Sequence, residues 1–242
     1  MPRNRRRVSR SLPIHLGADP EEAAAEAARL IAASLREAIT ARGRATVAFS
    51  GGTTPWAMLR ALASAKVDWQ LVDVFQIDER VAPRGDTERN ATHIEASLVR
   101  HAPVARAHWH PIPVEEPDPA GAARRYERTL REISDGVLDV VHLGLGDDGH
   151  TASLVPGDPV LGVTDRLVAP TATYLGHRRV TLTYPAINAA RHIVWLIAGA
   201  GKGEMLRRLV AGDPTIPAGR VLQDRAAVVC DEAAAAPLLT DR

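Results

Sequence analysis

The feature that most constrains the fold is an alternation of short apolar runs with longer helix-forming segments. Apolar runs of this length, rich in valine, isoleucine and leucine, predict buried strands. Strands joined through helices pair in parallel with right-handed crossovers. The sequence therefore predicts an α/β fold, a single domain with a mainly parallel, Rossmann-like sheet flanked by helices. The expected strands are 45–49, 72–77, 137–143, 179–183, 192–198 and 226–230.

Capping signals place the helices between these runs. The first helix is expected over 19–41, with Asp19 as N-cap, Pro20 in the first turn and Gly43 at the end. A glycine-hydroxyl loop after the first strand ends at Pro55, which suits the first position of the next helix, with Thr53 or Thr54 as its cap. Further helices are expected over 55–63, 92–100, 120–133, 185–190 and 203–210, and after Asp231.

Three segments are predicted to lack regular structure. Asp78–Arg80 reads as a loop that ends the strand at 72–77, and 156–170 contains proline and glycine. The proline-rich stretch 103–119 reads as a long surface connection. Because core strands lie on both sides of it, we interpret 12–242 as one domain.

The charge of the chain is unevenly distributed. The formal net charge is +1, but residues 1–10 hold five arginines and no acid, which leaves the remainder with 25 basic and 29 acidic residues. A mildly acidic body does not favour nucleic-acid binding. Residues 1–11 are interpreted as a flexible basic N-terminal tail, as is usual of termini.

Compartment signals favour the cytoplasm. No apolar run approaches the roughly 18 residues that span a membrane, so no membrane partner is expected. The arginine-rich start is not followed by the apolar core of a secretory signal. A single cysteine, Cys230, suits a reducing compartment and lies in an apolar run that favours burial. The sequence leaves monomer and dimer open.

The segment that carries chemistry is Gly144-Leu-Gly-Asp-Asp-Gly-His-Thr-Ala-Ser153, which follows the strand at 137–143. It places one imidazole, His150, beside two carboxylates, Asp147 and Asp148. Histidine is a suitable general base near neutral pH. Loops at the carboxyl ends of strands in α/β sheets usually hold the ligands.

The same loop matches the dinucleotide fingerprint G-x-G-x-x-G. That fingerprint needs a helix opening at its third glycine, so that the helix N-terminus meets the pyrophosphate. Here Pro156 and Gly157 interrupt any such helix within two turns. We therefore expect no nicotinamide cofactor.

Five segments in order resemble the 6-phosphogluconolactonases, within the glucosamine/galactosamine-6-phosphate isomerase superfamily. The resemblance covers about residues 12–238. The segments are Ser50–Pro55 (SGGTTP), Asp78–Arg80 (DER), Gly144–Pro156 (GLGDDGHTASLVP), Arg179–Thr183 (RVTLT) and Gly199–Lys202 (GAGK).

The resemblance implies a small-molecule sugar phosphate as substrate and no metal or cofactor. It implies hydrolysis of 6-phospho-D-glucono-1,5-lactone to 6-phospho-D-gluconate, in the oxidative branch of the pentose phosphate pathway. His150 would be the general base, with Asp148 or Asp78 orienting the imidazole or the water. The expected substrate and phosphate contacts are Ser50, Gly51, Gly52, Thr53, Arg80, Gly146, Arg179 and Lys202.

These contacts suit an anion. The Gly51–Thr53 segment precedes a helix start, where N–H groups face outward, and arginine and lysine supply positive charge. We expect the groups to converge because their loops would leave the carboxyl ends of strands.

Two other functions share part of these sequence features. A glucosamine-6-phosphate deaminase resembles this chain, but carries a Glu five residues after the histidine, where this chain has Val155. A non-catalytic sugar-phosphate sensor would keep the phosphate contacts without a working base. Such regulators normally carry a helix-turn-helix, for which the tail is too short. The sequence favours the lactonase over both.

Overall fold

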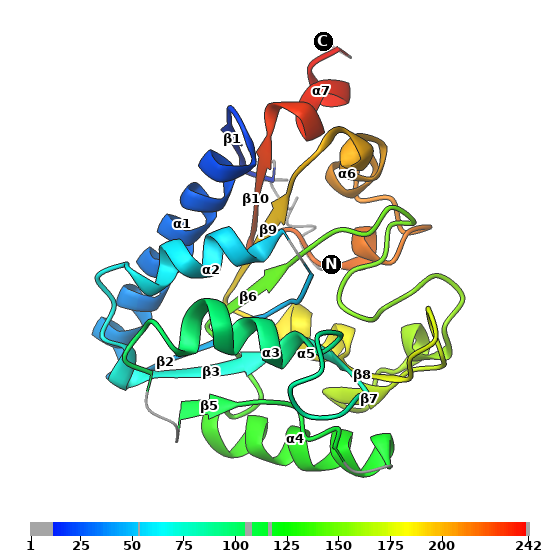
Figure 1. Ribbon diagram of the computed structural model, residues 1–242. Coiled ribbons are helices and arrows are strands. Elements are labelled where there is room, and N and C mark those ends of the chain that lie inside the picture. The colour runs from blue at the N-terminus through cyan, green and yellow to red at the C-terminus, as the bar shows by residue number, and fades with distance from the viewer. Residues whose placement is uncertain (1–11, 53, 105–107, 116–117, 241–242) are drawn as a thin grey trace, which may run out of the picture.

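The computed structural model describes residues 12–52, 54–104, 108–115 and 118–240 of the 242-residue chain. The predicted basic tail, residues 1–11, lies outside these ranges. The centre is a seven-stranded, all-parallel sheet, which confirms the predicted fold class (Figure 1). Its spatial order is β1 (Ile14–Gly17), β10 (Ala226–Asp231), β9 (His192–Ile197), β6 (Val140–Leu143), β2 (Ala45–Phe49), β3 (Val72–Gln76) and β5 (Trp109–His110).

Helices cover both faces of this sheet and create two hydrophobic cores. Side chains alternate across a strand, so Val194 and Leu196 of β9 pack in one core while Trp195 and Ile197 pack in the other. The first face carries α1 (Pro20–Arg42), α2 (Pro55–Ala63) and α3 (Asn90–Ile94), with a π-helical continuation at Glu95–Val99. The second face carries α4 (Pro119–Ser134), α5 (Tyr184–Ala189), α6 (Gly203–Val210) and α7 (Glu232–Thr240).

The predicted helix boundaries hold where a cap defines them. The Asp19 carboxylate accepts hydrogen bonds from the backbone N–H groups of Glu21 and Glu22, and Gly43 ends α1 with φ of 75°. α2 starts at Pro55 as predicted, but Thr54 makes no side-chain capping bond. Thr53 lies outside the described residues.

The main correction concerns Asp78–Arg80, which forms strand β4 instead of a loop. β4 pairs antiparallel with β8 (Arg179–Leu182), which pairs with β7 (Val168–Pro170), inside the stretch predicted to be irregular. Because β4 has three polar residues, no apolar alternation reveals it. Ile77 joins the two sheets: its N–H donates to the carbonyl of Phe49 in β2, and its carbonyl accepts from the N–H of Leu182 in β8.

Smaller differences occur at the sheet edges. Strand β1 was not predicted, because it is an edge strand whose Ile14 and Leu16 are exposed and so it shows no buried run. Strand β5, two residues within the proline-rich connection, was not predicted either. Among the described residues, no helix is long and apolar enough to cross a membrane.

Candidate active site

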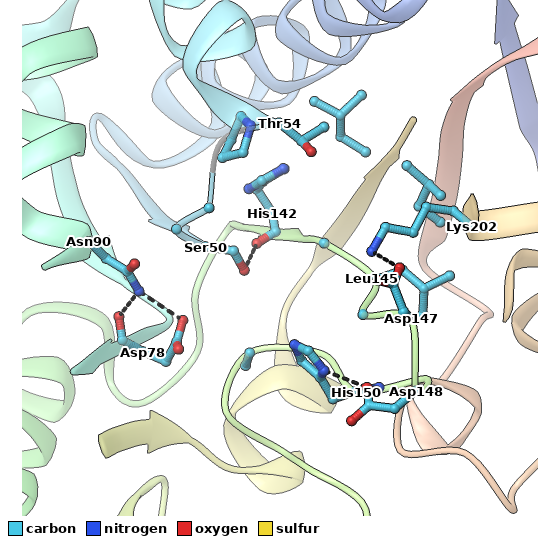
Figure 2. Close-up of a pocket in the computed structure, with 18 of the residues that line it drawn as sticks. Ser50, Thr54, Asp78, Asn90, His142, Leu145, Asp147, Asp148, His150 and Lys202 are labelled. Atoms are coloured by element: carbon cyan, nitrogen blue, oxygen red, sulfur yellow. Dashed lines mark hydrogen bonds and ion pairs between the residues drawn. The ribbon is translucent and has the colours of Figure 1, made fainter. Parts of the chain in front are cut away.

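A cavity of about 430 Å3 opens where β2, β6 and β9 end, and loops from both sheets form its wall. Ten of the eleven residues predicted to form the site lie on this wall. Figure 2 labels five of them: Ser50, Asp78, Asp148, His150 and Lys202. The eleventh, Thr53, falls outside the described residues. The ten are Ser50, Gly51, Gly52, Asp78, Arg80, Gly146, Asp148, His150, Arg179 and Lys202.

His150 and Asp148 form a pair in the loop after β6. One Asp148 carboxylate oxygen, Oδ1, lies 2.5 Å from Nδ1 of His150 and accepts the backbone N–H of the same residue at 3.0 Å. Burial raises the pKa of Asp148, but the two hydrogen bonds from His150 outweigh it and lower the pKa below its usual value. The pair therefore joins an ionised carboxylate to one ring nitrogen, and the other nitrogen points away from Asp148 (Figure 2).

Gly146 makes room for this imidazole. A Cβ at position 146 would lie 2.1 Å from Nδ1 of His150, and the Gly146 N–H donates to the His150 carbonyl at 2.8 Å. The φ of Gly146 is not in the left-handed region, so close approach explains this glycine better than turn geometry.

Asp78 is buried and satisfied by other groups. Its Oδ2 accepts from the Ser153 hydroxyl at 2.6 Å, and its Oδ1 accepts from the Asn90 side-chain amide at 3.3 Å. Of the two acids considered as partners of the imidazole, Asp148 makes the contact and Asp78 does not. Asn90 also approaches Gly51, where a Cβ would lie 1.8 Å from its Oδ1. This network fixes the first glycine loop against β4.

Arg80 and Arg179 lie directly opposite each other in the β4–β8 ladder. Cross-strand partners share one face of a sheet, so both guanidinium groups belong to the cavity side. This corrects the expectation that all the cationic groups leave the carboxyl ends of parallel strands, because these two sit within the antiparallel sheet. Arg80 donates to the Glu88 carbonyl at 2.7 Å.

Arg179 is a buried cation that forms no ion pair among the described residues. Its side chain is 6% exposed, its Nε has no hydrogen-bond partner, and no described carboxylate forms an ion pair with it. Burial lowers its pKa, although the nearby Asp78 carboxylate opposes this. Because a buried charge is costly until it is paired, Arg179 is suited to bind an anion. The neighbouring Arg178 is exposed.

Lys202 follows β9 in the short 3-10 helix Ala200–Lys202. Its ammonium lies 2.6 Å from a carboxylate oxygen of Asp147, which is 82% exposed (Figure 2). An anion that binds Lys202 therefore meets this carboxylate. On the opposite wall, the Ser50 hydroxyl donates to the His142 carbonyl at 3.0 Å and so holds the glycine loop to β6.

Tyr174 and Leu175 also line the cavity, although neither was predicted from the sequence. Both belong to the hairpin between β7 and β8, in a stretch without a catalytic motif. The Leu175-Gly176 pair just before Arg179 is the only local signal, because glycine there is compatible with a tight hairpin turn.

Known proteins resemble the chain over most of its length. Residues 18–230 match the family described as glucosamine-6-phosphate isomerases/6-phosphogluconolactonase. A 6-phosphogluconolactonase of Synechocystis sp. is 36% identical over 203 residues, covering 81% of this chain and 84% of that protein. A 6-phosphogluconolactonase of Rhizobium meliloti is 35% identical over 224 residues, covering 90% and 96%.

The fold resembles solved structures as well. The crystal structure of a 6-phosphogluconolactonase from Thermotoga maritima has a TM-score of 0.81 at 28% identity, covering 90% of this chain and 98% of that one. The family match extends from α1 to β10 and includes the ten predicted site residues on the wall. The chain therefore belongs to the family of glucosamine-6-phosphate isomerases and 6-phosphogluconolactonases.

Proposed function

We propose that the chain is a 6-phosphogluconolactonase, which hydrolyses 6-phospho-D-glucono-1,5-lactone to 6-phospho-D-gluconate in the oxidative pentose phosphate pathway. Its relatives in Synechocystis and Rhizobium carry this name. The observation that carries the proposal is the Asp148–His150 pair on the wall of a cavity that also holds three cationic side chains. That combination fits a reaction that deprotonates water next to an anionic substrate.

In the proposed reaction, the free nitrogen of His150 takes a proton from a water molecule as its oxygen bonds to C1 of the lactone. Asp148 holds the other ring nitrogen and stabilises the imidazolium that forms. The C1–O5 bond then breaks, and the imidazolium returns the proton to O5. The products are the open-chain acid and a base ready for the next cycle.

The cationic side chains hold the negative charge of the substrate. Arg179 is the strongest candidate for a phosphate oxygen, because among the described residues no carboxylate pairs with it. Arg80 faces the same space from the opposite strand, and Lys202 approaches from the far side of the cavity. N–H groups of the Gly51–Gly52 turn complete the predicted anion contacts.

The deaminase alternative lacks an acid–base group. The position five residues after His150, where the deaminases carry a Glu, holds Val155, which is 7% exposed and cannot transfer protons. The sensor alternative would keep the phosphate contacts and lack activity, so an assay decides between the two.

The assay measures loss of 6-phospho-D-glucono-1,5-lactone, corrected for spontaneous opening. We expect the wild type to accelerate hydrolysis and His150→Gln to lose on the order of 10²- to 10⁴-fold in kcat, the usual contribution of a general base. His15→Gln, on edge strand β1, is the matched control and should keep full activity.

Each outcome of this assay has a separate meaning. A wild type that does not exceed the spontaneous rate would contradict the proposed function. If His150→Gln matches the wild type, lactone hydrolysis stands but another group is the base. Ammonia release from glucosamine 6-phosphate would support the deaminase.

A further inference from the structure

The hairpin between β7 and β8 has a tightly defined tip. Tyr174 and His177 exchange backbone hydrogen bonds of 3.0 and 3.2 Å, and the two residues between them, Leu175 and Gly176, have φ of 48° and 80°. Two consecutive positive φ angles are typical of a type I′ turn. A leucine rarely adopts this conformation, and Leu175 is 75% exposed, so burial of its side chain does not explain it.

This turn directs Tyr174 against three groups of the candidate active site. Its hydroxyl donates to Oδ2 of Asp148 at 3.3 Å. Its ring packs edge-on against the His150 imidazole, with centroids 5.8 Å apart and planes at 68°. The guanidinium of Arg179 lies over the same ring, 5.2 Å from its centroid.

We propose that Tyr174 is a positioning residue that aligns the Asp148–His150 pair and connects it to Arg179; this inference rests on the proposed function of the site. Asp148 uses one oxygen for His150 and the other for Tyr174, so its carboxylate is held from both sides. A carboxylate held in this way keeps the imidazole in one orientation. The ring also offers its face to the Arg179 cation, which forms no ion pair in the described part of the chain.

The hydroxyl stays protonated over the working range. Burial raises the pKa of Tyr174, and the negative charge of Asp148 raises it further. Tyr174 therefore donates to the carboxylate at neutral pH, as the positioning role requires.

Kinetics of two variants separate the hydroxyl from the ring. For Tyr174→Phe we expect kcat to fall about 3- to 10-fold with KM changed less than about twofold, the effect of one lost hydrogen bond to a charged group that does not touch substrate. For Tyr174→Ala we expect a larger fall in kcat and a KM raised roughly threefold, because Arg179 loses its aromatic support. Unchanged kcat in Tyr174→Phe would overturn the proposal.

Tyr184→Phe is the matched control. Tyr184 donates its hydroxyl to the Pro217 carbonyl at 2.8 Å and carries Arg220 over its ring, but it does not line the cavity. Tyr184→Phe also removes one hydroxyl hydrogen bond, but away from the cavity, so its kcat should equal that of the wild type. A loss equal to that of Tyr174→Phe would mean that the effect is one of stability, and would also overturn the proposal.

An ultraviolet titration tests the contact without any turnover. The chain has three tyrosines, and burial raises the pKa of Tyr184 to about 12 and that of Tyr126 further. The first phenolate to form with rising pH should therefore be Tyr174, and Tyr174→Phe should abolish that step. In Asp148→Asn the step should move to lower pH, because the carboxylate that opposes ionisation is gone.

The titration keeps this inference separate from the proposed function. If the wild type hydrolyses no lactone but the step moves in Asp148→Asn, the lactonase assignment fails and the Tyr174–Asp148 contact stands. If the step does not move, the contact does not exist in solution and the positioning role is wrong.

Discussion

At the scale of single residues, the candidate active site contains a buried charge that lowers the stability of the protein and suits the binding of an anion. Arg179 brings a cation into the protein without an acidic partner among the described residues. Replacing such a charge with an apolar side chain of similar length often stabilises a protein. Because the buried charge of Arg179 is unfavourable for stability, we expect it to bind a ligand.

Arg179→Met should therefore raise stability and weaken binding together. We expect the free energy of unfolding in urea to rise by about 1 kcal/mol. We expect the affinity for 6-phosphogluconate, measured by calorimetry, to fall roughly 10- to 100-fold, as for one lost charged contact. Arg178→Met, at the exposed neighbouring position, should change the affinity little. If Arg179→Met binds the product as tightly as the wild type, Arg179 does not contact the substrate.

The Asp147 carboxylate competes with the substrate phosphate for the ammonium of Lys202. Asp147→Asn removes a carboxylate that an incoming phosphate would have to approach, so the affinity for 6-phosphogluconate should rise about threefold. Stability should change by less than about 0.5 kcal/mol, since exposed ion pairs contribute little. Asp165→Asn, which breaks an exposed pair with Arg166, is the control and should leave the affinity unchanged. A weaker affinity in Asp147→Asn would show that Asp147 supports binding.

Site residues could be predicted from the sequence where a single local motif contains them. His150 and Asp148 are two residues apart, so the loop alone places both groups at the site, although the sequence left Asp148 and Asp78 open as the partner of the imidazole. Tyr174 could not be found this way, because a separate hairpin brings it to Asp148, 26 residues distant. The contact of Lys202 with Asp147 is likewise tertiary.

At the scale of elements, the loop Gly144–Ser153 both carries the catalytic side chains and contacts the small antiparallel sheet. Its residues hold the imidazole at one end and, through Ser153, the buried Asp78 of β4 at the other. The loop therefore links the main sheet to the small antiparallel sheet. A larger residue at position 146 should move the His150 imidazole and leave the fold intact.

Gly146→Ala tests this separation. The new Cβ would meet the His150 ring at about 2 Å, so the ring must leave its place beside Asp148. We expect kcat to fall about 10²-fold, the scale of a misplaced catalytic group. Gly162→Ala, where a Cβ meets nothing within 4 Å, is the control and should keep its activity. Unchanged kcat in Gly146→Ala would mean that the ring tolerates displacement.

The elements differ in how well the sequence predicts them. Strands β2, β6, β9 and β10 are buried on both faces, so their apolar runs are visible. β4 and β7 have three residues each and form through distant partners, so no local pattern marks them. Arg80 and Arg179 were both predicted as site residues. Their cross-strand pairing was not, because it depends on the small sheet.

At the scale of the whole molecule, the sheet covered on both faces buries titratable groups that the proposed reaction does not use, and His142 is one of them. His142 lies in β6, is 1% exposed, and neither ring nitrogen has a hydrogen-bond partner among the described residues. Burial lowers its pKa to about 3. The folded state therefore favours the neutral imidazole, and protonation of His142 favours unfolding.

The sign of the resulting pH dependence follows from proton linkage. Between the ordinary histidine pKa of about 6.5 and the folded value of about 3, the unfolded chain binds a proton that the folded chain does not, so stability falls as pH falls. At pH 5 the contribution is about 2 kcal/mol. His142→Leu removes this proton uptake and the unpaired nitrogens with little change in volume. Urea unfolding at pH 7.5 and pH 5 should therefore show a smaller loss of stability in His142→Leu than in the wild type, whereas His101→Gln, at an exposed position, should match the wild type. An equal loss in all three proteins would mean that His142 takes up its proton in the folded state, in contact with water.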